Sequence, residues 1–218
     1  MSDNLHRYRA ELIKEMGANA YRTSHYPHVE AMMDALDELG RMVLDETRWY
    51  ESTDEGKAQL EALVKRDRNH PSVILWSTGN EEPMHATEQG RRIALSLRAH
   101  LLKFDKSRPI TTATDNPMNA VIVDTVDVMS VNYSLQYYDE FHKKYPAVPF
   151  VSSECCATGT TRGWYQEDCE KRSFMSAYDK DTTNWFMARE KTWKFIAERE
   201  WVAGCFRWIA FEHRGECV

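Results

Sequence analysis

The sequence predicts a parallel α/β fold, and three observations support this. Short apolar runs alternate with amphipathic segments along most of the chain, as strands alternate with helices in such folds. The connections between these segments are mostly short. Two of the apolar runs are followed by a glutamate, Glu81 and Glu154, and parallel α/β barrels build their functional sites at the carboxyl ends of the strands.

The first predicted element is a helix rather than a strand. Apolar residues repeat at helical spacing over residues 2–16, and Gly17 is suited to end that helix. The same spacing recurs over residues 29–40. Strands are expected over residues 18–24 and 42–44, because each is a short run bounded by turn residues or by polar side chains.

The alternation continues to the end of the chain. Further helices are expected over residues 56–66, 88–104, 137–145 and 185–199. Further strands are expected over residues 73–76, 110–113, 126–131, 150–152 and 202–211, and a long polar loop over 158–181. The pattern therefore contains roughly seven strands alternating with helices.

This arrangement is close to an eight-stranded α/β barrel with one strand absent. Such a barrel usually needs about 250 residues, whereas this chain has 218 and opens on a helix. We interpret residues 1–218 as one barrel domain that lacks its first strand. The strands on either side of the gap would have unpaired edges, so we expect dimerisation or another element to cover them.

Composition excludes several classes of function. The chain carries 28 basic and 34 acidic residues, intermixed, for a formal net charge of −6. Without a basic block, we expect binding neither to nucleic acid nor to a membrane surface. No apolar stretch is long enough to span a membrane, and the first residues do not resemble a secretory signal. The compartment stays open between cytoplasm and periplasm.

The five cysteines are interpreted as free thiols. They are Cys155, Cys156, Cys169, Cys205 and Cys217. Their number is odd, their spacing does not suit a zinc site, and adjacent cysteines rarely bridge each other. We expect no bound metal and no cofactor.

The two glutamates suit the hydrolysis of a glycosidic bond. With retention of configuration, this reaction needs one carboxylic acid to protonate the leaving oxygen and one carboxylate to attack the anomeric carbon. Glu81 would be the acid and Glu154 the nucleophile. The spacing alone also allows a plainer interpretation, in which each is a charge near a helix N-terminus or in a solvated loop.

Several motifs in order resemble the glycoside hydrolases of family 2, which include β-galactosidases, β-glucuronidases and β-mannosidases. The segments that carry this resemblance are Arg22-Thr-Ser-His-Tyr-Pro27, Arg66-Asp-Arg-Asn-His-Pro-Ser-Val73, Trp76-Ser-Thr-Gly-Asn-Glu81, Ser153-Glu154, Arg162-Gly163, Phe206-Arg-Trp208 and Arg214-Gly-Glu216. Motifs of this length in the same order are far more specific than one short pattern.

The resemblance implies a TIM (β/α)8 barrel, with Glu81 as general acid/base and Glu154 as nucleophile in a two-step retaining mechanism. It also implies that residues 1–218 are part of a catalytic domain, and the β-sandwich domains that precede the barrel in the family do not occur in this chain. An exposed edge and an incomplete pocket leave a rival interpretation open, namely a carbohydrate-binding fragment without activity.

The resemblance also implies substrate contacts, each with a structural alternative. Arg22 would hold the nucleophile ionised, or tie the barrel layers together. Asn80 and His25 would bind sugar hydroxyls, although His25 is also compatible with a loop histidine bonded to local backbone. Tyr133 would donate to the nucleophile. Trp208 would provide an aromatic platform for the sugar ring, or be a core residue.

The resemblance favours a β-galactosidase, with a β-glucuronidase or β-mannosidase as alternatives. The wording around Asp45-Glu46 and Glu154 is most similar to the galactosidase branch. A uronic acid substrate would require a cation in the pocket, and Arg48 or Arg162 is a candidate for that role. Asp45 and Glu46 are expected to serve packing or substrate hydroxyls rather than catalysis.

Overall fold

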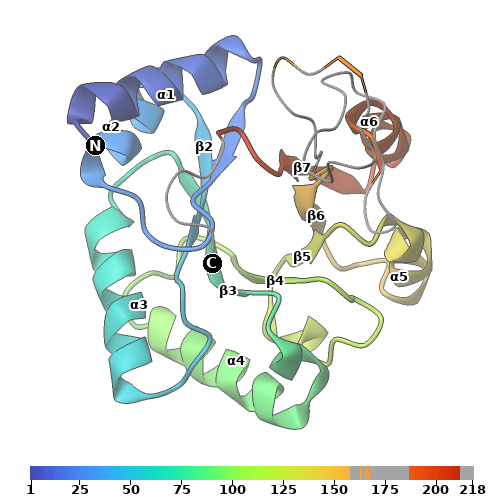
Figure 1. The fold of residues 1–218 in the computed structure, drawn as a ribbon. Helices are drawn as coiled ribbons and strands as arrows, with labels where there is room; N and C mark the ends of the chain where they lie inside the picture. The colour runs from blue at the N-terminus through green and yellow to red at the C-terminus, as the bar shows by residue number, and fades with distance from the viewer. Residues whose placement is uncertain (158–162, 164, 167–186, 212–218) are drawn as a thin grey trace.

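The computed structural model describes residues 1–157, 163, 165, 166 and 187–211, and Figure 1 shows its fold. In this part of the chain the strands are β1 (Ala20–Arg22), β2 (Met42–Glu46), β3 (Val73–Asn80), β4 (Ile110–Thr114), β5 (Met129–Asn132), β6 (Phe150–Cys155) and β7 (Val202–Arg207). The α-helices are α1 (Asp3–Glu15), α2 (Glu30–Leu39), α3 (Asp54–Asp67), α4 (Glu88–Leu101), α5 (Tyr138–Lys144) and α6 (Arg189–Ala197). Short 3-10 helices are η1 (Pro83–Ala86), η2 (Val123–Thr125) and η3 (Leu135–Tyr137).

The strands form one parallel sheet in chain order from β1 to β7. The sheet curls into an incomplete barrel, and the helices lie around its outside (Figure 1). Because every connection returns the chain to the same end of the sheet, all carboxyl ends of the strands meet on one face. The predicted TIM-type barrel with an incomplete ring of strands is confirmed.

The two ends of the sheet are connected by side chains. His25, after β1, stacks on Trp208, after β7, with 5.2 Å between ring centroids. The guanidinium of Arg9 in α1 lies 4.3 Å from the ring centroid of Phe211. The described strands β1 and β7 are nevertheless the ends of the sheet, so dimerisation at this gap stays a prediction.

Three strands extend further than the sequence predicts. β2 includes Glu46, β3 continues to Asn80, and β6 continues through Glu154. Polar side chains were expected to end these strands, but the parallel pairing continues past them. For example, the Tyr133 N–H donates to the Glu154 carbonyl at 2.7 Å. Polar residues remain in the strands because their side chains are bonded to one another across the sheet.

One strand begins later than expected. The predicted strand 126–131 corresponds to β5, which begins at Met129. The carboxylate of Asp127 is bonded to the Arg98 guanidinium at 2.7 and 2.8 Å and to the N–H of Ile110 at 2.9 Å. These bonds hold the segment before Met129 as a connection rather than as a strand.

The apolar core lies between the sheet and the surrounding helices. Its largest fully buried side chains are Trp76, Tyr138, Phe141, Phe150, Ile13, Met32, Met33, Leu36, Leu44, Leu60, Leu97 and Leu101. The indole N–H of Trp76 is satisfied by Asp105 at 2.9 Å, as a buried polar group requires. Among the described helices, none has the length and apolar character needed to cross a membrane.

Candidate active site

The carboxyl ends of the strands bring most of the predicted site residues together. Contributions come from the ends of β1, β2, β3, β5 and β6 and from the segment after β7, and the residues are Arg22, His25, Glu46, Asn80, Glu81, Asn132, Tyr133, Glu154 and Trp208. These residues are far apart in the chain and become neighbours because parallel strands end on one face.

Glu154 is buried, and both of its carboxylate oxygens are bonded. Its side chain lies at the end of β6 with only 4% of the residue exposed. Arg22 donates to Oε1 at 2.6 Å, and the Tyr133 hydroxyl donates to Oε2 at 2.9 Å. Burial and the Glu154 carboxylate raise the pKa of Tyr133, so its hydroxyl keeps its proton as a donor. The carboxylate is therefore charge-compensated and fixed in orientation.

Arg22 is the centre of the polar network. Its guanidinium donates to both oxygens of Glu46, each at 2.9 Å, and to the side-chain oxygen of Asn80 at 2.7 Å. Burial by itself would lower the pKa of Arg22, but the charges of Glu46 and Glu154 raise it. Arg22 thus combines the two roles that the sequence left open, since it contacts Glu154 and also ties β1 to β2 and β3.

Glu46 is fully buried, at 0% exposed. Burial favours the neutral acid, but Arg22, His25 and Ser77 outweigh it, and the pKa of Glu46 is lowered. The Ser77 hydroxyl donates to Glu46 Oε2 at 2.7 Å. A buried carboxylate with this many donors remains ionised and holds Arg22 in place.

Glu81 has a different environment from Glu154. It follows β3, is exposed to solvent, and accepts from the side-chain amide of Asn132 at 2.9 Å. Partial desolvation by the surrounding walls raises the pKa of Glu81, Asn132 opposes the rise, and the charges of Glu154 and Asp115 add to it. Desolvation is the largest of these causes, ahead of the charge of Glu154. A carboxyl group with a raised pKa is suited to donate a proton.

An amide chain connects the two glutamates. The Asn132 amide donates to Asn80 at 2.8 Å as well as to Glu81, and the Ser153 hydroxyl donates to the Asn132 carbonyl oxygen at 2.7 Å. Asn80 in turn accepts from Arg22. The positions of both carboxylates are therefore set by one hydrogen-bonded network.

The backbone at two of these residues is in the left-handed region. Glu81 has φ 52° and Tyr133 has φ 51°, a conformation that is uncommon for residues other than glycine and is concentrated at functional sites. The Glu81 N–H is bonded to the Ala113 carbonyl at 2.8 Å, which holds this turn. Each turn comes directly after a strand and redirects the side chain at the strand end.

His25 and Trp208 form one wall beside Glu154. Their rings are stacked at an interplanar angle of 27°, and both residues are half-buried. His25 Nδ1 lies 3.1 Å from Glu46 Oε1, and its Nε2 lies 3.9 Å from Glu154 Oε1. Trp208 is therefore at the site rather than in the apolar core.

A comparison with known protein families identifies the family of this barrel. The family described as glycosyl hydrolases family 2, TIM barrel domain, matches residues 2–56 and 50–206. The chain belongs to this family. The resemblance seen in the sequence motifs is confirmed.

The curated relatives of this family 2 barrel include proteins named β-glucuronidase and a protein named β-galactosidase. It is 34% identical over 182 residues to a β-glucuronidase of Felis catus, covering 78% of this chain and 27% of the relative. It is 24% identical over 273 residues to the β-galactosidase BoGH2A of Bacteroides ovatus, covering 94% of this chain and 31% of the relative. The chain spans between about a fifth and a third of the length of the curated relatives it matches.

Solved structures share the fold. A family 2 member from Bacteroides cellulosilyticus is 30% identical with a TM-score of 0.75, over 94% of this chain and 25% of that one. A β-glycosidase from Bacteroides vulgatus is 28% identical with a TM-score of 0.77, over 95% of this chain and 32% of that one.

Two residues of this candidate site are not assigned from the sequence. Glu46 was kept apart from catalysis together with Asp45, yet it contacts Arg22, whereas Asp45 accepts a bond from Thr23 at 3.1 Å. Burial and Asp67 raise the pKa of Asp45 well above its ordinary value. Asn132 was not singled out, although it ends a strand and precedes Tyr133 much as Asn80 precedes Glu81. This shared pattern, an asparagine at the end of a strand just before a site residue, is the sequence signal that points to Asn132.

No metal centre is found within the described residues, because none of their His, Cys, Asp and Glu side chains form a group of three or more that would suit a metal ion. Cys155, Cys156 and Cys205 have free thiols. Cys169 and Cys217, and Arg162 as a candidate for binding a uronic acid, lie outside the described residues.

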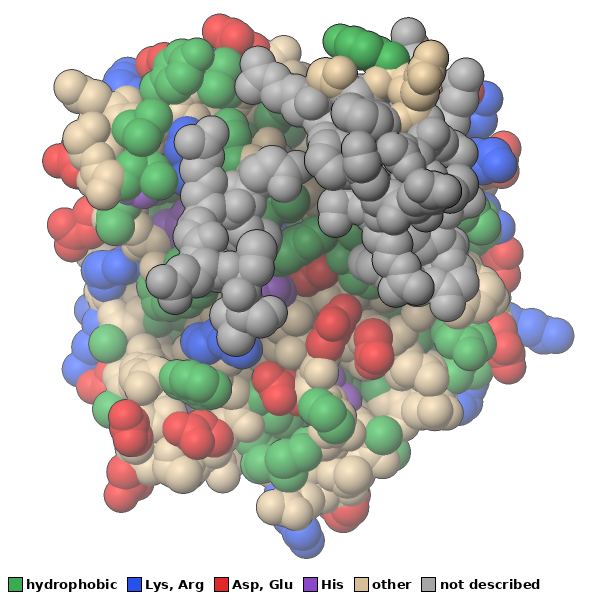
Figure 2. Space-filling model, in the orientation of Figure 1, with side chains coloured by type: hydrophobic (Ala, Val, Ile, Leu, Met, Phe, Trp, Pro, Cys, Tyr) green, Lys and Arg blue, Asp and Glu red, His purple; other side chains and the backbone are tan. Residues whose placement is uncertain are grey.

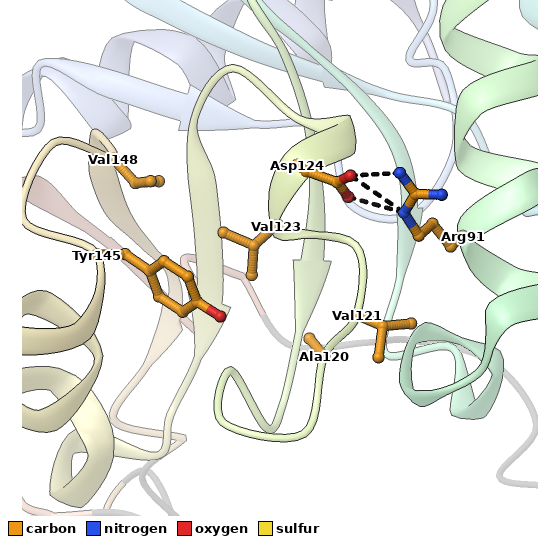
Figure 3. Close-up of a pocket in the computed structure, with 7 residues that line it drawn as sticks. All are labelled: Arg91, Ala120, Val121, Val123, Asp124, Tyr145 and Val148. Carbon is orange, nitrogen blue, oxygen red and sulfur yellow. Dashed lines mark hydrogen bonds and ion pairs between the residues drawn. The ribbon is translucent and has the colours of Figure 1, made fainter.

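The face that carries the strand ends is rich in acidic side chains. Figure 2 shows Asp and Glu gathered around the middle of this face, where the surface is hollowed. A second concavity of about 510 Å³ lies on the outer wall, lined by Arg91, Ala120, Val121, Val123, Asp124, Tyr145 and Val148 (Figure 3). It contains none of the strand-end residues, and the Arg91–Asp124 ion pair crosses one side of it. The candidate catalytic residues therefore lie on the face with the strand ends and not in this second concavity.

Proposed function

We propose that this chain is the catalytic barrel of a retaining β-glycosidase, with Glu154 as nucleophile and Glu81 as general acid/base. The proposal rests on the different environments of the two carboxyl groups. Glu154 is buried and bonded by Arg22 and Tyr133, whereas Glu81 is solvent-exposed and its pKa is raised. Two carboxyl groups in such different environments suit the two roles of this reaction.

In the first step, a Glu154 oxygen forms a bond to the anomeric carbon as the glycosidic C–O bond breaks. Glu81 gives its proton to the departing oxygen. In the second step, Glu81 takes a proton from water, the water oxygen bonds to the anomeric carbon, and the bond to Glu154 breaks. Tyr133 and Arg22 stabilise the carboxylate of Glu154 as it is released.

The sugar is proposed to lie against the wall formed by His25 and Trp208. Their stacked rings flank Glu154, and an aromatic face suits the C–H face of a sugar ring. Asn80 Oδ1 and His25 Nδ1 lie beside the Arg22 guanidinium, and we propose that the Asn80 amide nitrogen and His25 Nε2 bind sugar hydroxyl groups.

We propose β-galactosides as the first substrate class, because the sequence motifs are most similar to that branch. β-Glucuronides are the second, and they are supported by the β-glucuronidase names of several relatives, including one that is 34% identical. β-Mannosides are a further alternative within the family.

Hydrolysis of nitrophenyl β-galactoside, β-glucuronide, β-mannoside and β-glucoside tests the proposal. We expect turnover of one of these sugars by the chain and no turnover by Glu154→Gln, because that variant removes the attacking carboxylate. Release of nitrophenol measures the rates. A carbohydrate-binding fragment would instead keep its sugar affinity in calorimetry and show no turnover in either form, which would refute the proposed activity.

The pH dependence tests the role of Glu81. A raised pKa keeps Glu81 protonated above the ordinary glutamate value of about 4.3, so the fall in activity on the alkaline side should come as pH rises through that raised pKa. We expect a bell-shaped dependence of kcat/KM on pH for a substrate with a poor leaving group. Glu81→Gln should lose the basic limb, and a dinitrophenyl substrate should depend little on Glu81. An unchanged basic limb in Glu81→Gln would contradict the assignment.

A further inference from the structure

An exposed tryptophan and an arginine lie at the rim of the site, in the loop after β2. Trp49 is 52% exposed, and the guanidinium of Arg48 lies 5.1 Å from the centroid of its ring. The exposed face of this ring is available to stack on a flat apolar group.

Tyr50, the residue after Trp49, anchors the loop to the barrel. The buried Tyr50 hydroxyl donates to the Gly90 carbonyl at 2.7 Å, and its ring packs edge-on against His85 at 4.7 Å between centroids. The chain before it is held by the bond from the Thr47 N–H to the Ser77 carbonyl at 3.1 Å. Trp49 therefore lies between two fixed points above the ends of β2 and β3, which suits a pre-organised binding surface.

The rim lies on the side of the site where Glu81 is found. The Thr47 N–H is bonded to Ser77 of β3, and Tyr50 packs on His85, four residues after Glu81, so the loop lies beside the segment that carries Glu81. The proposed sugar wall of His25 and Trp208 belongs instead to β1 and β7, beside Glu154. The two sides of the site are therefore distinct.

The roles of the two glutamates indicate on which side of the site the leaving group lies. The sugar is bonded by Glu154, and the departing oxygen is protonated by Glu81, so the leaving group extends past Glu81 and away from Glu154. Trp49, in the loop after β2, the strand that pairs with β3 just before Glu81, offers a flat apolar face there, and Arg48 reinforces the loop by its contact with the indole.

Resting on the proposed function, we propose that Trp49 and Arg48 form the leaving-group subsite, and that Trp49 binds aryl leaving groups by stacking. The subsite acts only while the leaving group is present. It therefore affects the first step of the reaction and the transfer of the sugar to an aromatic alcohol, but not hydrolysis of the glycosyl-enzyme.

The test compares phenyl and methyl β-glycosides of the sugar on which the chain is active. Trp49→Ala should lower kcat/KM for the phenyl glycoside about five- to tenfold, the value of an aromatic stacking contact. It should change kcat/KM for the methyl glycoside less than twofold. Transfer of the sugar to benzyl alcohol should fall by a similar factor relative to transfer to methanol. Trp49→Phe should retain most of the preference.

Trp193→Ala is the matched control, because Trp193 is 54% exposed in α6, a helix on the outside of the barrel (Figure 1). It should leave both substrates unchanged. Equal losses on phenyl and methyl glycosides in Trp49→Ala, or no loss on either, would overturn the subsite. Absence of any turnover by the unaltered chain would instead refute the proposed function, so the two failures are distinguishable.

Discussion

Replacement of Glu154 by glycine is expected to reduce hydrolysis by about four orders of magnitude or more, because no other group replaces the attacking carboxylate. Azide should restore turnover and yield an α-glycosyl azide. The reason is geometric, since azide would enter the space left by the Glu154 side chain and attack the sugar from that face. Product configuration is read by NMR spectroscopy.

The corresponding change at Glu81 should have the opposite stereochemical outcome. In Glu81→Gly, the nucleophile still forms the glycosyl-enzyme from a substrate with a good leaving group, and azide then attacks from the face that Glu81 had occupied. The product should be the β-glycosyl azide. Glu82→Gly is the matched control, and it should keep hydrolysis. An α product from Glu81→Gly, or a β product from Glu154→Gly, would show that the two roles are reversed.

Replacement of Arg22 by methionine is expected to lower the free energy of unfolding by about 3–5 kcal/mol, because it leaves a buried charge without its partner. Glu46 is fully buried and accepts from Arg22 through both of its carboxylate oxygens. Activity should also be lost, since Arg22 contacts Glu154 at 2.6 Å. Urea unfolding followed by circular dichroism measures the first effect.

A double variant separates stability from activity. Arg22→Met with Glu46→Gln removes one of the two buried carboxylate charges that Arg22 compensates, so it should recover part of the stability, because Glu154 remains, but none of the activity. Arg7→Met is the control, because Arg7 pairs with Glu38 at the surface and should change stability by less than about 1 kcal/mol. A similar small change in Arg22→Met would contradict the central role of this arginine.

Much of the fold was predictable because the apolar spacing within each segment matches the helix or strand that the segment forms. The amphipathic spacing that predicted a helix over residues 2–16 corresponds to α1, and the apolar run from Val73 begins β3. Boundaries at polar strand ends were not predictable. Glu46 and Glu154 are polar, and only the partners that meet them inside the barrel explain why β2 and β6 continue to include them.

The sequence by itself determined the family, the order of strands and helices, and the two glutamates at strand ends, because these depend on residue types and spacings that are local. Only the tertiary structure decided how these residues act on one another. It placed Glu46 beside Arg22, and Asn132 beside Glu81, through the pairing and curling of the parallel sheet. It also made desolvation the main cause of the raised pKa of Glu81, because desolvation depends on which elements pack around a group and not on its neighbours in the chain.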